Sequence, residues 1–148
     1  MNEVISSWLE QSKRYLRAAD SQLQSTPEIA YNSALMAGEV ALKAILDKLC
    51  LFEKTDEHHD MLELCKKITR RVSLNNRIVA LVKELSYINL TYEDTHADSP
   101  SGMTSKIRYH YKEIPPYILI RAEDAQEKIE LAKELISRIE EDWNKFKI

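Results

Sequence analysis

The stretch PEIAYNSALMAGEVALKAILDKLCL, residues 27–51, decides the fold. Its apolar side chains recur at helical spacing and cover more than one face, which is typical of a helix buried in the middle of a domain. Thr26 is a suitable helix cap, and Pro27 suits the first turn. Small residues on one face would let a neighbouring helix approach closely. These small residues are Ala34, Ala37, Gly38 and Ala41.

The segments on both sides of this central helix also carry apolar residues three or four positions apart. These segments are residues 4–23, a short one at 61–71, residues 73–92 with Ser73 as a cap, and residues 116–146. Residues 93–116 are rich in loop formers and predict a long connection, which is a frequent place for function. Glycine and proline are few, and no period-two strand pattern stands out. The sequence predicts one all-α domain over residues 1–148, an up-and-down four-helix bundle with an additional short helix between the second and third long helices.

Composition excludes several classes of function. The net charge of −3 gives no overall attraction to nucleic acid or to an anionic membrane, so such binding needs a local patch. Cys50 and Cys65 are too few for a disulfide framework and lack zinc-site spacing. His58 and His59 stand among acidic residues, but neighbours in a helix point in different directions and make poor co-ligands. We therefore expect no metal, no cofactor, no membrane span and a cytoplasmic location.

Glu39 and Lys43 lie four residues apart on the central helix, in the order that favours an ion pair. One interpretation is a partly exposed surface pair worth a few tenths of a kcal/mol, or roughly 0.2–0.5. The other is a charged pair at a groove or a dimer seam.

The run Lys106-Ile107-Arg108-Tyr109-His110-Tyr111-Lys112 combines four potential cations with two aromatic rings. In an extended segment the cations would fall on one side and the tyrosines on the other. Phosphate binding with base stacking uses these residue types, and His110 is a candidate general acid or base. A solvated loop whose tyrosines fold back onto the bundle explains the same pattern.

Several short motifs, in order along most of the chain, resemble the HEPN domain family of small helical bundles. The motifs are Trp8-Leu9, Ala18-Ala19-Asp20, the segment from Ala37 to Leu46, His59-Asp60-Met61-Leu62, Tyr87-Ile88 with Tyr92-Glu93-Asp94, and Ala122-Glu123-Asp124-Ala125. Such domains occur beside nucleotidyltransferases and in toxin–antitoxin systems, and the resemblance implies a nucleotide, RNA or protein partner.

Ribonucleases of that family carry an arginine followed, after four to six residues, by a histidine at a dimer groove, and they need no metal. Neither His96 nor His110 has an arginine at that distance, and Thr91 stands where many relatives have an arginine before the tyrosine matched by Tyr92. The sequence therefore argues against ribonuclease activity.

The leading hypothesis is a non-nucleolytic homodimer that binds a nucleotide, RNA or a nucleotidyltransferase. Its site would comprise Glu39, Lys43, His59, Tyr92 and the run from Lys106 to Lys112. Two alternatives stay open. One is a metal-independent endoribonuclease toxin that uses Arg108 and His110, and the other is a purely structural interaction protein.

Overall fold

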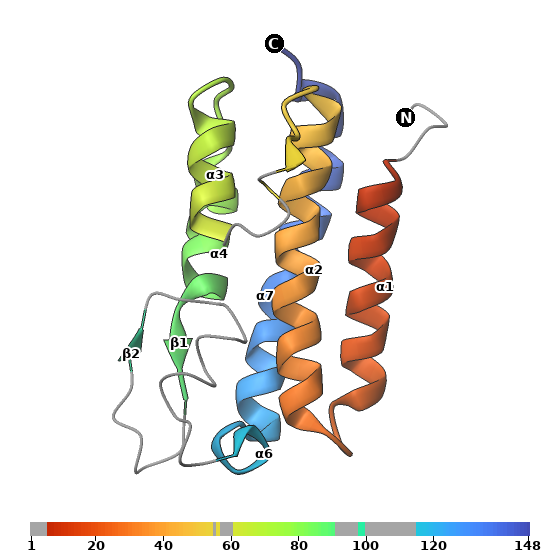
Figure 1. Cartoon of the computed structure of the whole chain (residues 1–148), viewed down its shortest axis with the longest axis vertical. Coiled ribbons are helices and arrows are strands. Elements are labelled where there is room, and N and C mark those ends of the chain that lie inside the picture. The colour runs from red at the N-terminus through yellow and green to blue at the C-terminus, as the bar shows by residue number, and fades with distance from the viewer. Residues whose placement is uncertain (1–5, 55, 57–60, 91–97, 100–114) are drawn as a thin grey trace.

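The structure is a computed structural model, and it describes residues 6–54, 56, 61–90, 98–99 and 115–148. The elements are α1 (Ser7–Gln22), α2 (Pro27–Lys48), α3 (Met61–Thr69), α4 (Asn76–Ser86), β1 (Ile88–Asn89), β2 (Asp98–Ser99), α6 (Pro116–Leu119), α7 (Ala122–Glu141) and the 3-10 helix η2 (Trp143–Lys145). In Figure 1, α1, α2, α4 and α7 alternate in direction, and the short α3 lies between α2 and α4 in the chain. The predicted helical bundle is confirmed.

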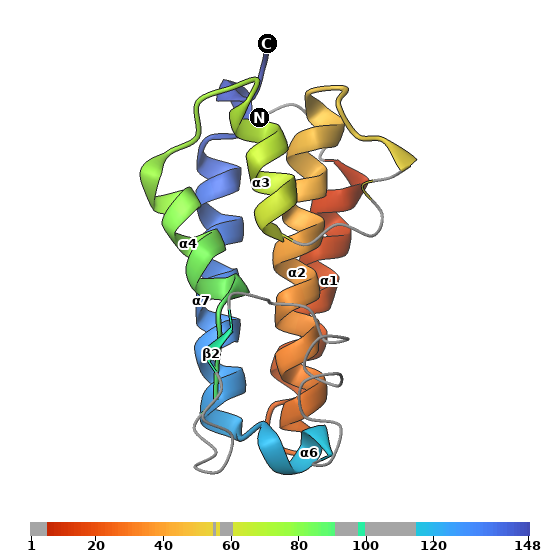
Figure 2. The same ribbon diagram turned by 60° about the vertical axis from the view of Figure 1, so that its left-hand side comes forward.

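Helix α2 is the centre of the bundle. It packs against α1 and α7 most extensively and also contacts α3, α4 and α6 (Figures 1 and 2). Every residue from Ala37 to Leu46 is buried, which agrees with the apolar pattern over several faces. A Cβ on Gly38 would lie 2.3 Å from Leu85 Cδ2 and 2.9 Å from Met61 Sδ. The predicted close approach is therefore confirmed, and it brings α3 and α4 onto α2.

Helix α2 ends three residues earlier than the sequence predicted, at Lys48. Cys50 has a positive φ of 58°, and the Leu51 amide donates to the Leu46 carbonyl at 2.8 Å. This is the hydrogen bond of a Schellman cap, which usually has glycine in the left-handed position. At the other end, the Thr26 hydroxyl donates to Gln22 and does not cap α2.

Helix α4 is shorter than the predicted helix at 73–92. Its cap is Asn75, whose Oδ1 accepts the Arg77 amide at 2.7 Å, so the expectation for Ser73 was wrong. After Ser86 the chain becomes extended, and β1 pairs antiparallel with β2 through Ile88 opposite Ser99. These strands are two residues long each, so the all-α fold class predicted from the sequence is unchanged.

The last predicted helix, at 116–146, is divided at Ile120 and Arg121 into α6 and α7. Asp124 causes the restart because its Oδ2 accepts the Arg121 amide at 2.9 Å, as in a capping box. Helix α7 then runs the length of the bundle against α2, and η2 follows it (Figure 1).

Candidate functional site

The ion pair of Glu39 and Lys43 is buried halfway along α2. Lys43 Nζ lies 3.0 Å from Glu39 Oε2, and each side chain is only 6% exposed. By comparison, the side chains of the pair that Arg77 forms with Glu134 are 40% and 36% exposed. The interpretation of Glu39 and Lys43 as a partly exposed surface pair is therefore wrong.

Aromatic rings stand beside this pair. Lys43 Nζ lies 5.9 Å from the centre of the Trp8 ring, within the range of a cation–π contact. The Trp8 ring packs against Phe52, with 5.2 Å between the ring centres. Trp8 comes from the start of α1 and Phe52 from the segment after α2, so the beginning of α1 and the end of α2 are joined by this ring contact beside Lys43.

The beginning of α3 lies next to the same part of α2. Met61, its first residue, is buried at the position of Gly38, which precedes Glu39 in the chain. Asp56 fixes the approach to α3, because its Oδ2 accepts the Glu53 amide at 2.8 Å and Lys67 Nζ at 2.7 Å. Burial opposes the charge on Lys67, but the hydrogen bond and charge of Asp56 outweigh it and raise the Lys67 pKa.

The other predicted site residues lie outside the described residues. They are His59, Tyr92, Lys106, Arg108, Tyr109, His110, Tyr111 and Lys112. Among the residues that the structure describes, the predicted set is represented by Glu39 and Lys43, and these two are in contact. In the portions that the structure covers, no group of three His, Cys, Asp or Glu side chains is arranged to hold a metal. Cys65 is buried, and this burial raises the pKa of its thiol.

Lys128 on α7 is a buried cation that the sequence reasoning missed. Its Nζ donates to the carbonyl of Glu84 at 2.8 Å and to that of Tyr87 at 2.5 Å, so it closes the C-terminal end of α4. It also lies 5.9 Å from the Tyr31 ring centre. Burial lowers the pKa of Lys128 to about 8. The available signal was a lysine inside the apolar stripe that contains Ala125, Ile129 and Ala132.

A shallow depression of about 300 Å³ lies over this lysine. It is lined by Lys83, Glu84, Tyr87, Asn89, Glu127 and Lys128. Charges of both signs line it, so it carries no net preference for an anion or a cation.

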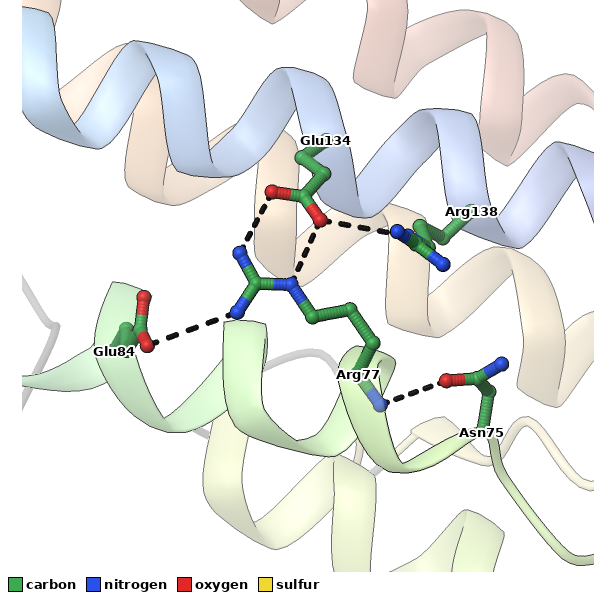
Figure 3. Close-up of polar contacts among 5 residues, drawn as sticks. All are labelled: Asn75, Arg77, Glu84, Glu134 and Arg138. Atoms are coloured by element: carbon green, nitrogen blue, oxygen red, sulfur yellow. Dashed lines mark hydrogen bonds and ion pairs between the residues drawn. The ribbon is translucent and has the colours of Figure 1, made fainter.

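A network of ion pairs ties α4 to α7 on the surface. Figure 3 shows Arg77 reaching from α4 to Glu134 on α7, with Nε to Oε2 at 2.7 Å and Nη2 to Oε1 at 2.8 Å. Arg138 approaches the same carboxylate at 3.4 Å. The hydrogen bond from Arg77 lowers the pKa of Glu134. Because Arg77 and Glu134 are both substantially exposed to water, this network stabilises the α4–α7 contact modestly.

The HEPN domain family matches the sequence over residues 5–142. The chain belongs to the HEPN domain family. The match covers all of the long helices described above and confirms the resemblance seen in the sequence motifs. No curated protein matches the chain, and no solved structure does. At the level of the family, this HEPN chain is a helical module related to nucleotides and RNA.

Helix α2 of this HEPN domain is long and apolar enough, by length and composition, to cross a membrane. However, 78% of its most apolar window is buried inside the bundle. Such burial is typical of the core helix of a soluble domain, and HEPN is a soluble domain family.

Proposed function

We propose that this HEPN domain binds a nucleotide or RNA without cleaving it, as a homodimer in the cytoplasm. The proposed site surrounds Glu39 and Lys43 and includes His59, Tyr92 and the run from Lys106 to Lys112. A nucleotidyltransferase is the protein partner that the family suggests. No metal or cofactor enters the proposal.

The observation that carries the proposal is the buried pair of Glu39 and Lys43. Removing two charges from water costs several kcal/mol each, roughly, and apolar residues of similar volume often stabilise a core as well or better. A core helix gains little stability from such a pair, and charged pairs in protected positions are frequent at functional sites. Trp8 beside Lys43 adds an aromatic surface, which is the second element that base recognition uses.

The absence of cleavage rests on the sequence. The arginine–histidine spacing of the family ribonucleases does not occur before His96 or His110. A cleavage assay on mixed RNA in EDTA tests this part, with Arg108→Ala and His110→Ala beside the unmodified chain. We expect intact RNA in every reaction. Cleavage by the unmodified chain that either variant abolishes would replace the proposal with a metal-independent endoribonuclease.

Binding is tested by fluorescence anisotropy with a labelled single-stranded RNA of about 20 nucleotides. The informative variant is the double change Glu39→Met with Lys43→Met, because it removes both charges of the pair at once. We expect at least a tenfold loss of RNA affinity in this variant while its unfolding midpoint stays close to that of the unmodified chain.

Lys128→Met is the matched control, since it removes another buried lysine that lies beside a different aromatic ring. We expect it to keep RNA affinity within about twofold, as the proposed site does not include it. Equal affinity in all three proteins would exclude the Glu39–Lys43 region from the site.

Light scattering after size-exclusion chromatography tests the homodimer, and a monomer at micromolar concentration would remove that part of the proposal.

A further inference from the structure

One stretch of the chain has a charge opposite to that of the whole. Residues 64–83 contain six of the 21 Lys and Arg residues and none of the 24 Asp and Glu residues. The other positions therefore carry 15 cations and 24 anions, a net charge of −9 against −3 for the entire chain. This stretch covers most of α3, the connection after it and most of α4.

Some of these cations are neutralised by neighbours. Lys67 pairs with Asp56 at 2.7 Å, Arg77 binds Glu134 through two hydrogen bonds, and Lys66 lies 3.5 Å from Glu63. Three of the six cations therefore have an acidic partner nearby, and their presence needs no further explanation.

Arg70 and Arg71 are different. Both are exposed, and their guanidinium groups make no ion pair or hydrogen bond with any residue that the structure describes. They follow the last turn of α3, whose dipole places about half a negative charge there. Lys66 and Lys67 already place positive charge in that last turn, so compensation of the helix dipole does not account for two further arginines. Their backbone amides complete the turn by donating to the carbonyls of Lys66 and Ile68.

The connection that holds these arginines turns the chain from α3 into the antiparallel α4 at one end of the bundle (Figures 1 and 2). Exposed uncharged polar side chains lie at the end of α3, on the connection and at the start of α4, namely Thr69, whose hydroxyl donates to the Lys66 carbonyl, Ser73 and Asn76. The C-terminal residues, which include the exposed Lys145 and Lys147, lie at the same end of the bundle. Nothing acidic occurs in the connection itself.

We infer that this basic corner, defined by Arg70 and Arg71, binds the phosphate backbone of single-stranded RNA. The inference rests on the proposed RNA binding and adds a second contact region to it. Guanidinium groups form paired hydrogen bonds with phosphate, and hydroxyl and amide side chains beside them suit the remaining phosphate and sugar oxygens.

The distance along α3 supports one continuous ligand. Met61, at the start of α3, lies at Gly38 beside Glu39, and Arg70 follows nine positions later. At 1.5 Å per residue the two ends of α3 are roughly 14 Å apart, which a few nucleotides span. A single-stranded RNA bound at Arg70 and Arg71 can therefore extend to the region of Glu39 and Lys43.

The test is the salt dependence of RNA binding by the variant Arg70→Gln with Arg71→Gln. Two lost phosphate contacts should reduce the slope of log K against log salt by about 1.4 and weaken binding roughly 25-fold at 0.1 M salt. The matched control is Arg14→Gln with Arg17→Gln, which removes two exposed arginines from α1 that already pair with Glu10 at 3.5 and 3.0 Å. We expect the control to bind within about threefold of the unmodified chain.

An equal slope in the Arg70/Arg71 variant and the unmodified chain would overturn the inference while leaving the proposed function intact. So would the same loss in both double variants, since it would reflect total charge alone. Displacement of the RNA by polyglutamate of matched charge as readily as by unlabelled RNA would assign the corner to an acidic protein instead. Failure of the unmodified chain to bind any RNA would refute the proposed RNA binding, and the inference with it.

Discussion

Breaking the pair of Glu39 and Lys43 on one side should destabilise the fold far more than removing both partners. Lys43→Met leaves the Glu39 carboxylate in a position where the side chain is 6% exposed, and Glu39→Met leaves the Lys43 ammonium in the same situation. Removing one partner of a buried ion pair while the other charge stays in place costs about 3–5 kcal/mol. The double variant has no such charge, so we expect its free energy of unfolding to lie within about 1 kcal/mol of that of the unmodified chain.

The distance in the structure gives the size of the coupling. At 3.0 Å between Nζ and Oε2, the attraction of two unit charges is about 5–6 kcal/mol for an effective dielectric constant of about 20. Two single losses of about 3–5 kcal/mol each and a double-variant change of at most about 1 kcal/mol give a coupling energy of at least about 5 kcal/mol in the double-mutant cycle, close to this attraction. The contact of Lys43 with the Trp8 ring is lost in both variants that carry the Lys43→Met change, so it cancels in the cycle.

Urea unfolding followed by circular dichroism at 222 nm measures all four proteins. The comparison is the exposed pair of Glu10 and Arg14, 3.5 Å apart on α1, whose cycle should give less than about 0.5 kcal/mol. A coupling for Glu39 and Lys43 as small as that of the surface pair would refute the reasoning, because it would mean that water screens the charges in solution.

Three further predictions concern the bundle. Gly38→Ala should lower the free energy of unfolding by about 1–2 kcal/mol, since its methyl group meets Leu85 Cδ2 and Met61 Sδ. Measured by urea unfolding against a Leu85→Ala parent, the same change should cost less, because only the Met61 contact then remains. Cys50→Gly should raise the melting temperature and stabilise the chain by about 0.5–1 kcal/mol, because glycine accepts the left-handed conformation at little cost; a lower melting temperature would contradict the cap assignment. Between pH 8 and about 10.4 the Lys128 side chain is protonated in the unfolded chain but neutral in the native state, so the native state becomes more stable as pH rises. In guanidinium unfolding, the free energy of unfolding of the unmodified chain should therefore increase by up to about 3 kcal/mol relative to that of Lys128→Met. A difference that does not change with pH would show that the pKa of Lys128 is not lowered.

The sequence predicted the existence of the helices well because an apolar stripe with helical spacing must be buried to fold. Boundaries were less accurate where one residue satisfies two patterns. Ile88 continues the helical spacing of Leu81 and Leu85, but it also alternates with the exposed Tyr87 and Asn89, and the structure places it in a strand. The boundary between α6 and α7 was missed for a similar reason, since the start of α7 at Arg121 depends on the Asp124 carboxylate three residues later.

The candidate site was less predictable for a physical reason. Spacing of four residues places Glu39 beside Lys43 whether the pair is exposed or buried, and only the packing of α1 and α3 onto α2 decides which. Lys128 posed the same problem, because the carbonyls that it binds lie more than 40 positions earlier in the chain. Contacts between residues so far apart in the sequence cannot be predicted from the spacing of neighbouring residues.

The two ends of the described chain lie at the same end of the bundle, where Lys13 Nζ on α1 meets Glu140 Oε2 on α7 at 2.6 Å (Figure 1). A circular permutant that joins residue 148 to residue 6 through a short glycine–serine linker should therefore keep all helix contacts. A protein fused after residue 148 would lie at the same end of the bundle as the basic corner, so an affinity tag for RNA-binding assays is better kept away from that position.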